Sequence, residues 1–296
     1  MTYKLKEKSG LFVKSRKLSV NGKTLYVSRI FWSIALTAAG VIMIIPFVWM
    51  LSAAFKRPLD VFEYPIRWIP AYWYPNNFIK VWNPQFHMLK AYWNSLKIST
   101  IITVGALFTS ALAGYAFAKI KFRGRNGLFL LYLATMMIPI QVTMIPKFIL
   151  FDQIGLLNTH GALILPGVFT ALGTFLMRQA YMQLPDALSE AALIDGANEF
   201  QIWSRIVTPL VKPTMASLAL LVFMGNWNNY EEPLIFLRDR NLFTIPLSLN
   251  TFMDEHIADY GLVMAAAASA LVPVILVFVF AQKYFVKGLT AGAVKG

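Results

Sequence analysis

Cysteine is absent from the 296 residues, and charged side chains make up only 14% of them. Without a thiol, the chain contains no disulfide, no thiolate zinc site and no cysteine nucleophile. The three histidines, His87, His160 and His256, lie far apart in the sequence, whereas metal sites need clustered donors. We therefore expect no metal site and no cofactor in this chain.

Apolar residues are abundant instead. They account for 57% of the chain, and the mean hydropathy is +0.57, whereas an ordinary soluble domain is about a quarter charged. A membrane-spanning helix needs roughly 20 apolar residues. We predict an all-α membrane protein with six transmembrane helices, at about Ile30–Phe55, Leu96–Ala118, Leu128–Phe151, Ala162–Tyr181, Ile206–Tyr230 and Gly261–Lys283.

Basic residues outnumber acidic ones by 27 to 14, which gives a net charge of +13. Residues 1–29 form a basic N-terminal arm before an uncleaved first span. With this arm placed in the cytoplasm, 18 of the 27 basic residues fall on the inner side. The bias predicts that both termini lie inside, and attraction to anionic lipid explains the charge without a nucleic-acid partner.

The arm contains a partial match to a nucleotide-binding motif. The segment Asn21–Thr24 (NGKT) resembles the end of a phosphate-binding loop, but Lys17 stands where the first glycine is needed. No other G-x-x-x-x-G-K sequence occurs in the chain. We therefore expect no ATPase site and no enzymatic activity in this chain, so any ATP-driven activity must come from a partner.

Prolines and aromatic residues mark two further regions. Pro139 and Pro146 should kink or break the third predicted span. Broken helices are tolerated in membranes where the freed carbonyls face protein or a water-filled cavity, so this span should line a path. The first outer loop, about Lys56–Ser95, is rich in Trp, Tyr, Pro and Asn; it either docks a partner or lies at the lipid headgroups.

The stretch EAALIDGANEFQIWSRIVTPL, which starts at Glu190, places acids, a glycine and an arginine between two apolar spans. Its first part should form a short helix, with Ala191 and Ala192 on one face and Gly196 at a left-handed helix end. A second helix should lead into the fifth span, with Pro209 in the first turns of that span. The pattern predicts a helix–turn–helix at the inner surface.

The spacing in this stretch resembles the EAA loop of binding-protein-dependent ABC importer permeases. Thr208 stands where that family usually has leucine before the proline. Four other stretches, MIPIQVTMIP, GLLNTHGALILP, NWNNYEEPLIFL and GLTAGAVKG, resemble the second, smaller permease of maltose-type carbohydrate importers. The resemblance covers roughly residues 30–296.

The resemblance implies a type I ABC importer permease fold in the bacterial cytoplasmic membrane, with a coupling loop at about residues 185–209. In that family the loop docks on a cytoplasmic ATPase subunit. The implied partners are a second permease subunit in a heterodimer, two ATPase subunits that bind ATP and Mg²⁺, an extracytoplasmic solute-binding protein and a saccharide. The implied coupling residues are Glu190, Ala191, Ala192, Asp195, Gly196, Ile206 and Pro209.

The end of the fifth predicted span offers a candidate substrate path. Amides, aromatic rings and acids of this kind bind sugars. The candidates are Asn226, Trp227, Asn228, Asn229, Tyr230 and Glu231. Two interpretations stay open, because the acids could equally lie at the outer interface. In maltose-type importers the partner permease holds most of the sugar, so this chain could supply the gate and the wall instead.

Two other classes of protein compete with an ATP-driven importer. An ion-coupled secondary transporter should bury several ionisable groups within its spans, and the centres of the six predicted spans contain almost none. A polytopic membrane enzyme needs catalytic groups that converge at membrane depth, and no such set is evident. The residues therefore favour a permease subunit that imports carbohydrate.

Overall fold

The computed structural model describes residues 22–256 and 259–293, and within these ranges the regular structure is helical, with no strand. The chain divides into two compact units, residues 1–49 and 50–296. The described part of the first unit belongs to α1, Gly22–Ala54, which continues into the second unit. Most of the predicted basic arm lies outside the described residues, and α1 begins within the arm's last part.

The second unit contains all the other helices, including short 3₁₀ segments and one π-helical segment, η4. In chain order they are η1 (Pro58–Asp60), α2 (Asn76–Val81), η2 (Pro84–Phe86), α3 (Met88–Lys119), α4 (Arg125–Ala134), η3 (Thr135–Met137), α5 (Ile140–Gln153), α6 (Gly161–Gly167), α7 (Ala171–Met182), α8 (Ala187–Ile194), α9 (Glu199–Gln201), η4 (Ile202–Val207), α10 (Thr208–Leu210), α11 (Lys212–Trp227), α12 (Glu231–Phe236), η5 (Arg240–Leu242), α13 (Ile245–Glu255) and α14 (Tyr260–Ala293).

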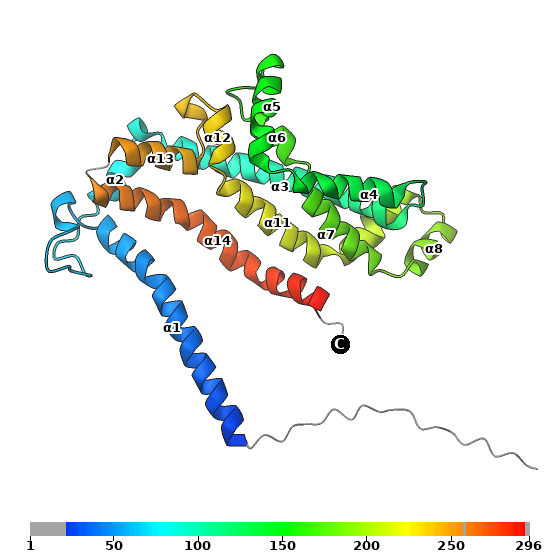
Figure 1. Ribbon diagram of the computed structural model, residues 1–296, viewed down its shortest axis with the longest axis horizontal. Coiled ribbons are helices and arrows are strands. Elements are labelled where there is room, and N and C mark those ends of the chain that lie inside the picture. Colours follow the sequence, from blue (N-terminus) through cyan, green and yellow to red (C-terminus); the bar gives the residue numbers. More distant parts are fainter. Residues whose placement is uncertain (1–21, 257–258, 294–296) are drawn as a thin grey trace, which may run out of the picture. The chain divides into compact units, whose positions relative to one another are not determined.

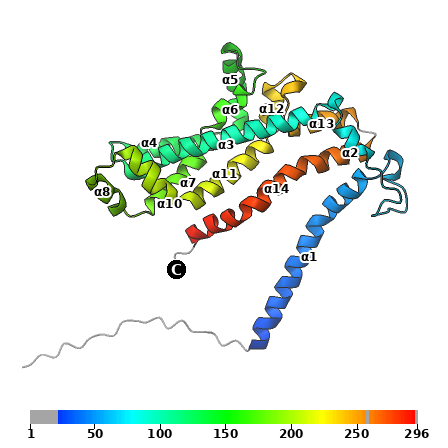
Figure 2. The same cartoon turned by 180° about the vertical axis from the view of Figure 1, so that it is seen from behind.

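Helix α3 is the central element of the second unit. It packs along α7 and α11, and α11 packs in turn along α14, as both views show (Figure 1, Figure 2). The turn that contains α8 lies at one end of this helix layer, whereas α12 and α13 lie toward the other end. The two candidate groups of functional residues therefore occupy opposite ends of the same helices.

Four described segments are individually long and apolar enough to cross a membrane: Ile30–Ala54, Met88–Lys119, Gly161–Met182 and Tyr260–Val279. The number reaches six if each of two bent helix pairs forms one span. These six segments follow the order of the six predicted from hydropathy. The all-helical architecture is confirmed, with four to six candidate spans.

The third predicted span is broken at Pro139. Arg125–Met137 and Ile140–Gln153 meet at 95°, and the backbone before Pro139 is extended, as steric contact with a proline ring requires. Pro146 lies inside α5 without ending it, so only one of the two prolines breaks the span.

The fifth predicted span is also bent. Glu199–Leu210 and Lys212–Trp227 meet at 82° around Val211, and Pro213 occupies the first turn of α11, where a proline is tolerated. Pro209 lies in α10, before the bend. Pro209 therefore lies in the first arm of this bent pair, ahead of the long arm formed by α11.

The second span begins earlier than hydropathy indicated. Helix α3 starts at Met88, and its polar residues Asn94 and Ser95 are buried. The Asn94 amide donates to two backbone carbonyls near η5, and Ser95 Oγ accepts from the backbone N–H of Ile245 at 2.8 Å. Asn94 and Ser95 thus lie in a helix and bond to distant parts of the chain, although their polarity is typical of a loop.

Two glycines allow α3 and α7 to approach each other closely. A Cβ atom on Gly114 would lie 2.6 Å from Met177 Cβ, and one on Gly173 would lie 2.3 Å from Ser110 Oγ. Small residues are typical of helix contacts in membranes, because close van der Waals packing replaces the hydrophobic effect there. The contact between α3 and α7 therefore depends on the absence of these side chains.

This packing predicts opposite effects for two Gly→Ala changes. Gly114→Ala should destabilise the chain by about 1–3 kcal/mol, because the added methyl group overlaps α7. Gly225→Ala in α11 should stabilise it by about 0.5–1 kcal/mol, since nothing lies within 4 Å of the new atom. Thermal unfolding of both variants in the same detergent measures the difference, and equal effects would contradict the proposed contact.

Candidate functional site

The helix–turn–helix expected from the sequence is present in the EAA segment, which we define as Pro185–Pro209. Helix α8 ends at Ile194 with Asp195 as its C-cap, and Gly196 follows with a φ of +82°, the left-handed conformation that favours glycine. The backbone N–H of Ala197 then donates to Ala192 O at 2.9 Å and closes the turn. Asn198 starts the next helix through a reciprocal capping box with Gln201.

The predicted coupling residues divide into an exposed set and a buried set. Glu190, Ala191, Asp195 and Gly196 are exposed at the surface of the chain. Ala192 is only 6% exposed and packs inside the chain, whereas the adjacent Ala191 lies at the surface. A one-residue step rotates the side chain by about 100° around a helix, which separates Ala192 from Ala191.

An apolar core ties the EAA segment to the long helices. Ala192 packs in this core with Ile202 and Trp203 of η4, and the half-buried Ile206 lies against it. The same core includes Tyr115 of α3, Met177 of α7 and Leu218 of α11. A displacement of the EAA segment must therefore move parts of α3, α7 and α11 with it, because close-packed interiors transmit strain.

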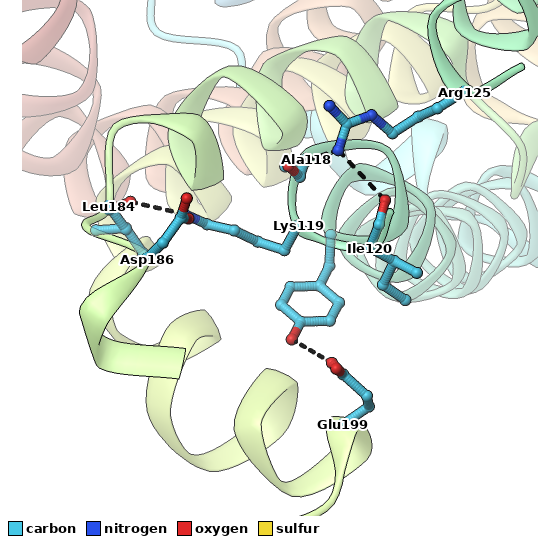
Figure 3. A network of polar contacts seen from close by, with 8 residues as sticks. Ala118, Lys119, Ile120, Arg125, Leu184, Asp186 and Glu199 are labelled. Atoms are coloured by element: carbon cyan, nitrogen blue, oxygen red, sulfur yellow. Dashed lines mark hydrogen bonds and ion pairs between the residues drawn. The ribbon is translucent and has the colours of Figure 1, made fainter. Parts of the chain in front are cut away.

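Lys119, the last residue of α3, holds the start of the EAA segment (Figure 3). Its Nζ donates to Leu184 O at 2.6 Å and to Asp186 Oδ1 at 2.5 Å, and its side chain is only 9% exposed. The ammonium group of Lys119 holds the pKa of the Asp186 carboxyl below its usual value. The ion pair therefore stabilises the folded state at pH values above the ordinary carboxyl pKa. This stabilisation is lost as the pH falls through the lowered pKa of Asp186.

Two tyrosines make further polar contacts to the EAA segment. Tyr115 of α3 donates from its hydroxyl to Glu199 Oε2 at 2.7 Å. The hydroxyl of Tyr181 in α7 lies 2.8 Å from the hydroxyl of Thr208. Thr208, which stands where the family usually has leucine, therefore makes a side-chain hydrogen bond that leucine could not make.

Sequence reasoning missed these anchors, Lys119, Tyr115 and Tyr181, because their partners lie far along the chain. The charge count treats Lys119 only as one of the basic residues on the inner side, although its position at the end of an apolar run is typical of a residue that caps a helix C-terminus. Its pairing with Asp186 joins residues 67 positions apart, which no local pattern reveals.

The candidate substrate-path residues are not gathered into one site. Trp227 is only 2% exposed and stacks on Phe223 within the helix packing. The side-chain amides of Asn226 and Asn228 donate to carbonyls one turn earlier in α11, at 2.8 and 2.9 Å. Asn228 is exposed and Asn226 is half-buried.

Residues 229–232, which follow Asn228 in the chain, connect the end of α11 to α5 and α13. Glu232, which was not among the predicted path residues, accepts from Lys147 Nζ at 3.1 Å and from Asn229 Nδ2 at 2.9 Å. Glu231 is exposed and accepts from Gln141 Nε2 at 3.3 Å, while Tyr230 donates to Asn250 of α13 at 3.2 Å. The acids therefore link the segment after the Pro139 break to α12.

Among the residues that the structure describes, no group of three or more His, Cys, Asp or Glu side chains is placed to hold a metal ion. The ring nitrogen Nε2 of His160 lies 2.9 Å from Leu242 O. Burial lowers the pKa of His160, which favours the neutral ring as a hydrogen-bond donor to that carbonyl. This histidine thus serves to join α6 to η5.

Comparison with solved structures shows the fold. A chain of a bacterial ABC transporter involved in the import of the acidic polysaccharide alginate matches with a TM-score of 0.77 and 24% identity, over 88% of this chain and 98% of that chain. This chain therefore shares its helical fold with that chain of the alginate transporter.

Comparison of sequences identifies the family. Residues 105–291 match the family described as "Binding-protein-dependent transport system inner membrane component", and the chain belongs to this family. The arabinooligosaccharides transport system permease protein AraQ of Halalkalibacterium halodurans is 36% identical over 86% of this chain and 92% of its own length. The trehalose/maltose transport system permease protein MalG of Thermococcus litoralis is 32% identical over 91% and 98%, respectively. The family resemblance read from the EAA segment is confirmed.

The anchor made by Lys119 predicts a local change in backbone protection. Lys119→Met keeps the apolar stem but leaves Leu184 O and Asp186 without their charged donor. Because a hydrogen bond to a charged group contributes about 1.5–3 kcal/mol, exchange of the amide hydrogens in α8 should accelerate by roughly ten- to a hundredfold. Hydrogen exchange followed by mass spectrometry measures this change.

Lys121→Met is the matched control, because it removes an equal charge two residues away from an exposed side chain. It should leave exchange in α8 unchanged. Equal protection of α8 in the wild type and in Lys119→Met would show that the apolar core alone holds the segment.

Proposed function

We propose that the chain is the transmembrane permease subunit of an ATP-driven carbohydrate importer. The observation that carries this proposal is the exposed acidic tip of the EAA segment, mounted on a core shared with α3, α7 and α11. Relatives named as arabinooligosaccharide and trehalose/maltose permeases support carbohydrate as the class of substrate. The chain itself contributes no ATPase site in this proposal.

The proposed mechanism is mechanical coupling. Glu190 forms a charge-assisted bond with a basic residue of the ATPase subunit, and the small Ala191 permits close approach beside it. Gly196 sets the turn that presents both residues and Asp195. Ala192, Ile206 and Pro209 act from within, as packing that passes the motion of α8 to the membrane helices.

The complete transporter requires partners beyond this chain. We propose a heterodimer with a second permease, two ATPase subunits that bind ATP and Mg²⁺, and an extracytoplasmic solute-binding protein that delivers the saccharide. One solved relative of the fold is an alginate ABC transporter in complex with a periplasmic protein bound to an alginate pentasaccharide, with a TM-score of 0.65. The proposed location is the bacterial cytoplasmic membrane.

The substrate path is proposed to run past the end of α11. The exposed amide of Asn228 and the exposed carboxylate of Glu231 offer weak polar contacts to a hydroxylated solute. Weak contacts suit a carrier, since the cargo must be released. The bend at Pro139 places the start of α5 beside this group, as the hydrogen bond from Gln141 to Glu231 indicates.

We propose six spans with both termini in the cytoplasm, each bent pair counting as one span. The 18 basic residues on the inner side, out of 27, support this orientation. The EAA segment then faces the cytoplasm, and α12 and α13 face outward. This is the arrangement that lets an ATPase and a solute-binding protein act from opposite faces.

Coupling through the EAA segment is tested by Glu190→Ala. We expect carbohydrate uptake to fall by roughly ten- to a hundredfold at equal expression, since a lost charge-assisted bond contributes about 1.5–3 kcal/mol. Uptake of a labelled saccharide and recovery of the ATPase with the permease are measured together. Asp152→Ala, which removes another exposed acid, is the control and should transport normally. Normal uptake by Glu190→Ala would exclude this role.

Orientation is tested by single cysteines, because the natural chain has none. Asp254→Cys on α13 should react in intact cells with a membrane-impermeant maleimide, whereas Gln183→Cys beside the EAA segment should react only after permeabilisation. Both positions are exposed, so access rather than burial decides the result. Labelling of Gln183→Cys in intact cells would overturn the proposed orientation.

A further inference from the structure

A shallow recess of about 350 Å³ lies at the turn between α3 and α4. It occurs where one apolar span ends at Lys119 and the next begins at Arg125, so it lies at the boundary between the apolar helices and water. No acidic residue is among those that line it. They are Lys121, Phe122, Gly124, Arg125, Asn126 and Gly127.

The polar groups of this recess are held in place by contacts behind it. Arg125 donates from Nη1 to Ala118 O and Ile120 O, each at 3.3 Å, and so caps the end of α3 (Figure 3). Arg178 of α7 donates to Asn126 Oδ1 at 3.3 Å. Because the amide oxygen is used by Arg178, the amide NH₂ group of Asn126 is left as a donor on the opposite side.

Arg178 is itself fixed from several directions. Its Nε donates to Phe117 O at 3.1 Å, and its guanidinium carbon lies 4.1 Å from the ring centroid of Phe129. These contacts join α7, α3 and α4 behind the recess. The recess therefore has a rigid back wall and an exposed front that carries the ammonium group of Lys121.

The surface beside the recess is apolar. Leu128, Leu130 and Leu131 of α4 are 52%, 65% and 68% exposed. A free inorganic phosphate would use only the cationic part of this surface. A molecule with an anionic head and hydrocarbon chains matches both parts, because positive charge next to apolar surface is the pattern that recognises anionic lipids.

We propose that this recess binds the phosphate headgroup of an anionic phospholipid. Lys121, Arg125 and the amide of Asn126 contact the phosphate oxygens, and the acyl chains lie along the exposed leucines of α4. Donors that converge from an ammonium, a guanidinium and an amide suit a phosphate. The residues that line the site lie outside the EAA segment and outside the proposed substrate path.

The test uses the assembled transporter, purified in detergent and titrated with phosphatidylglycerol or phosphatidylcholine, with bound lipid counted by native mass spectrometry. The wild type should retain phosphatidylglycerol preferentially. Lys121→Gln should weaken that binding about tenfold, the effect expected when one charged contact worth about 1.4 kcal/mol is lost. Asn126→Asp, which places a carboxylate in the recess, should weaken it as well.

Arg123→Gln is the matched control, because it removes the same charge from the same turn but Arg123 does not line the recess. It should bind phosphatidylglycerol nearly as the wild type does. Equal losses in Lys121→Gln and Arg123→Gln would overturn the proposal in favour of diffuse electrostatic attraction. Equal retention of phosphatidylglycerol and phosphatidylcholine would also overturn it, and so would displacement of phosphatidylglycerol by millimolar inorganic phosphate. A Lys121→Gln transporter that loses a protein subunit but binds lipid as before would overturn it too.

Discussion

The close approach of α3 to α7 is the constraint on which the rest of the second unit depends. Gly114 lets the two helix backbones come together, and the residues that follow it on α3 are then within reach of the EAA segment. Tyr115 reaches Glu199 and Lys119 reaches Asp186 from this position. The exposed tip of α8 is thus supported by packed helices rather than by a flexible loop, which is what transmission of a force requires.

Several polar contacts in this apolar chain lie at helix ends and near helix breaks. The last carbonyls of α3 accept hydrogen bonds from Arg125 and Arg178, cations at the end where the helix dipole is negative. Near the opposite end, Glu232 of α12 pairs with Lys147 of α5, the helix that follows the break at Pro139. Charged side chains therefore occur where backbone groups or other charges pair with them, because an unpaired charge in apolar surroundings is costly.

Much of the architecture could be predicted, because its causes are local. Long apolar runs located the candidate spans, Pro139 marked a real break, and Gly196 marked a real helix end. Predictions that required the rotation of a helix were less successful. Ala191 and Ala192 are adjacent and chemically identical, yet one is exposed and the other lies in the core. Trp227 similarly has a packing role that composition could not separate from a binding role.

The sequence by itself determined the helical class, the order of the apolar segments, the turn at Gly196 and the family pattern that begins at Glu190. Those features depend on hydropathy and backbone preferences, which act over a few residues. Only the tertiary structure decided that Lys119 holds Asp186 and that Arg178 orients Asn126. These pairs join residues 67 and 52 positions apart, so they exist only after helix packing has set the rotation and depth of each helix.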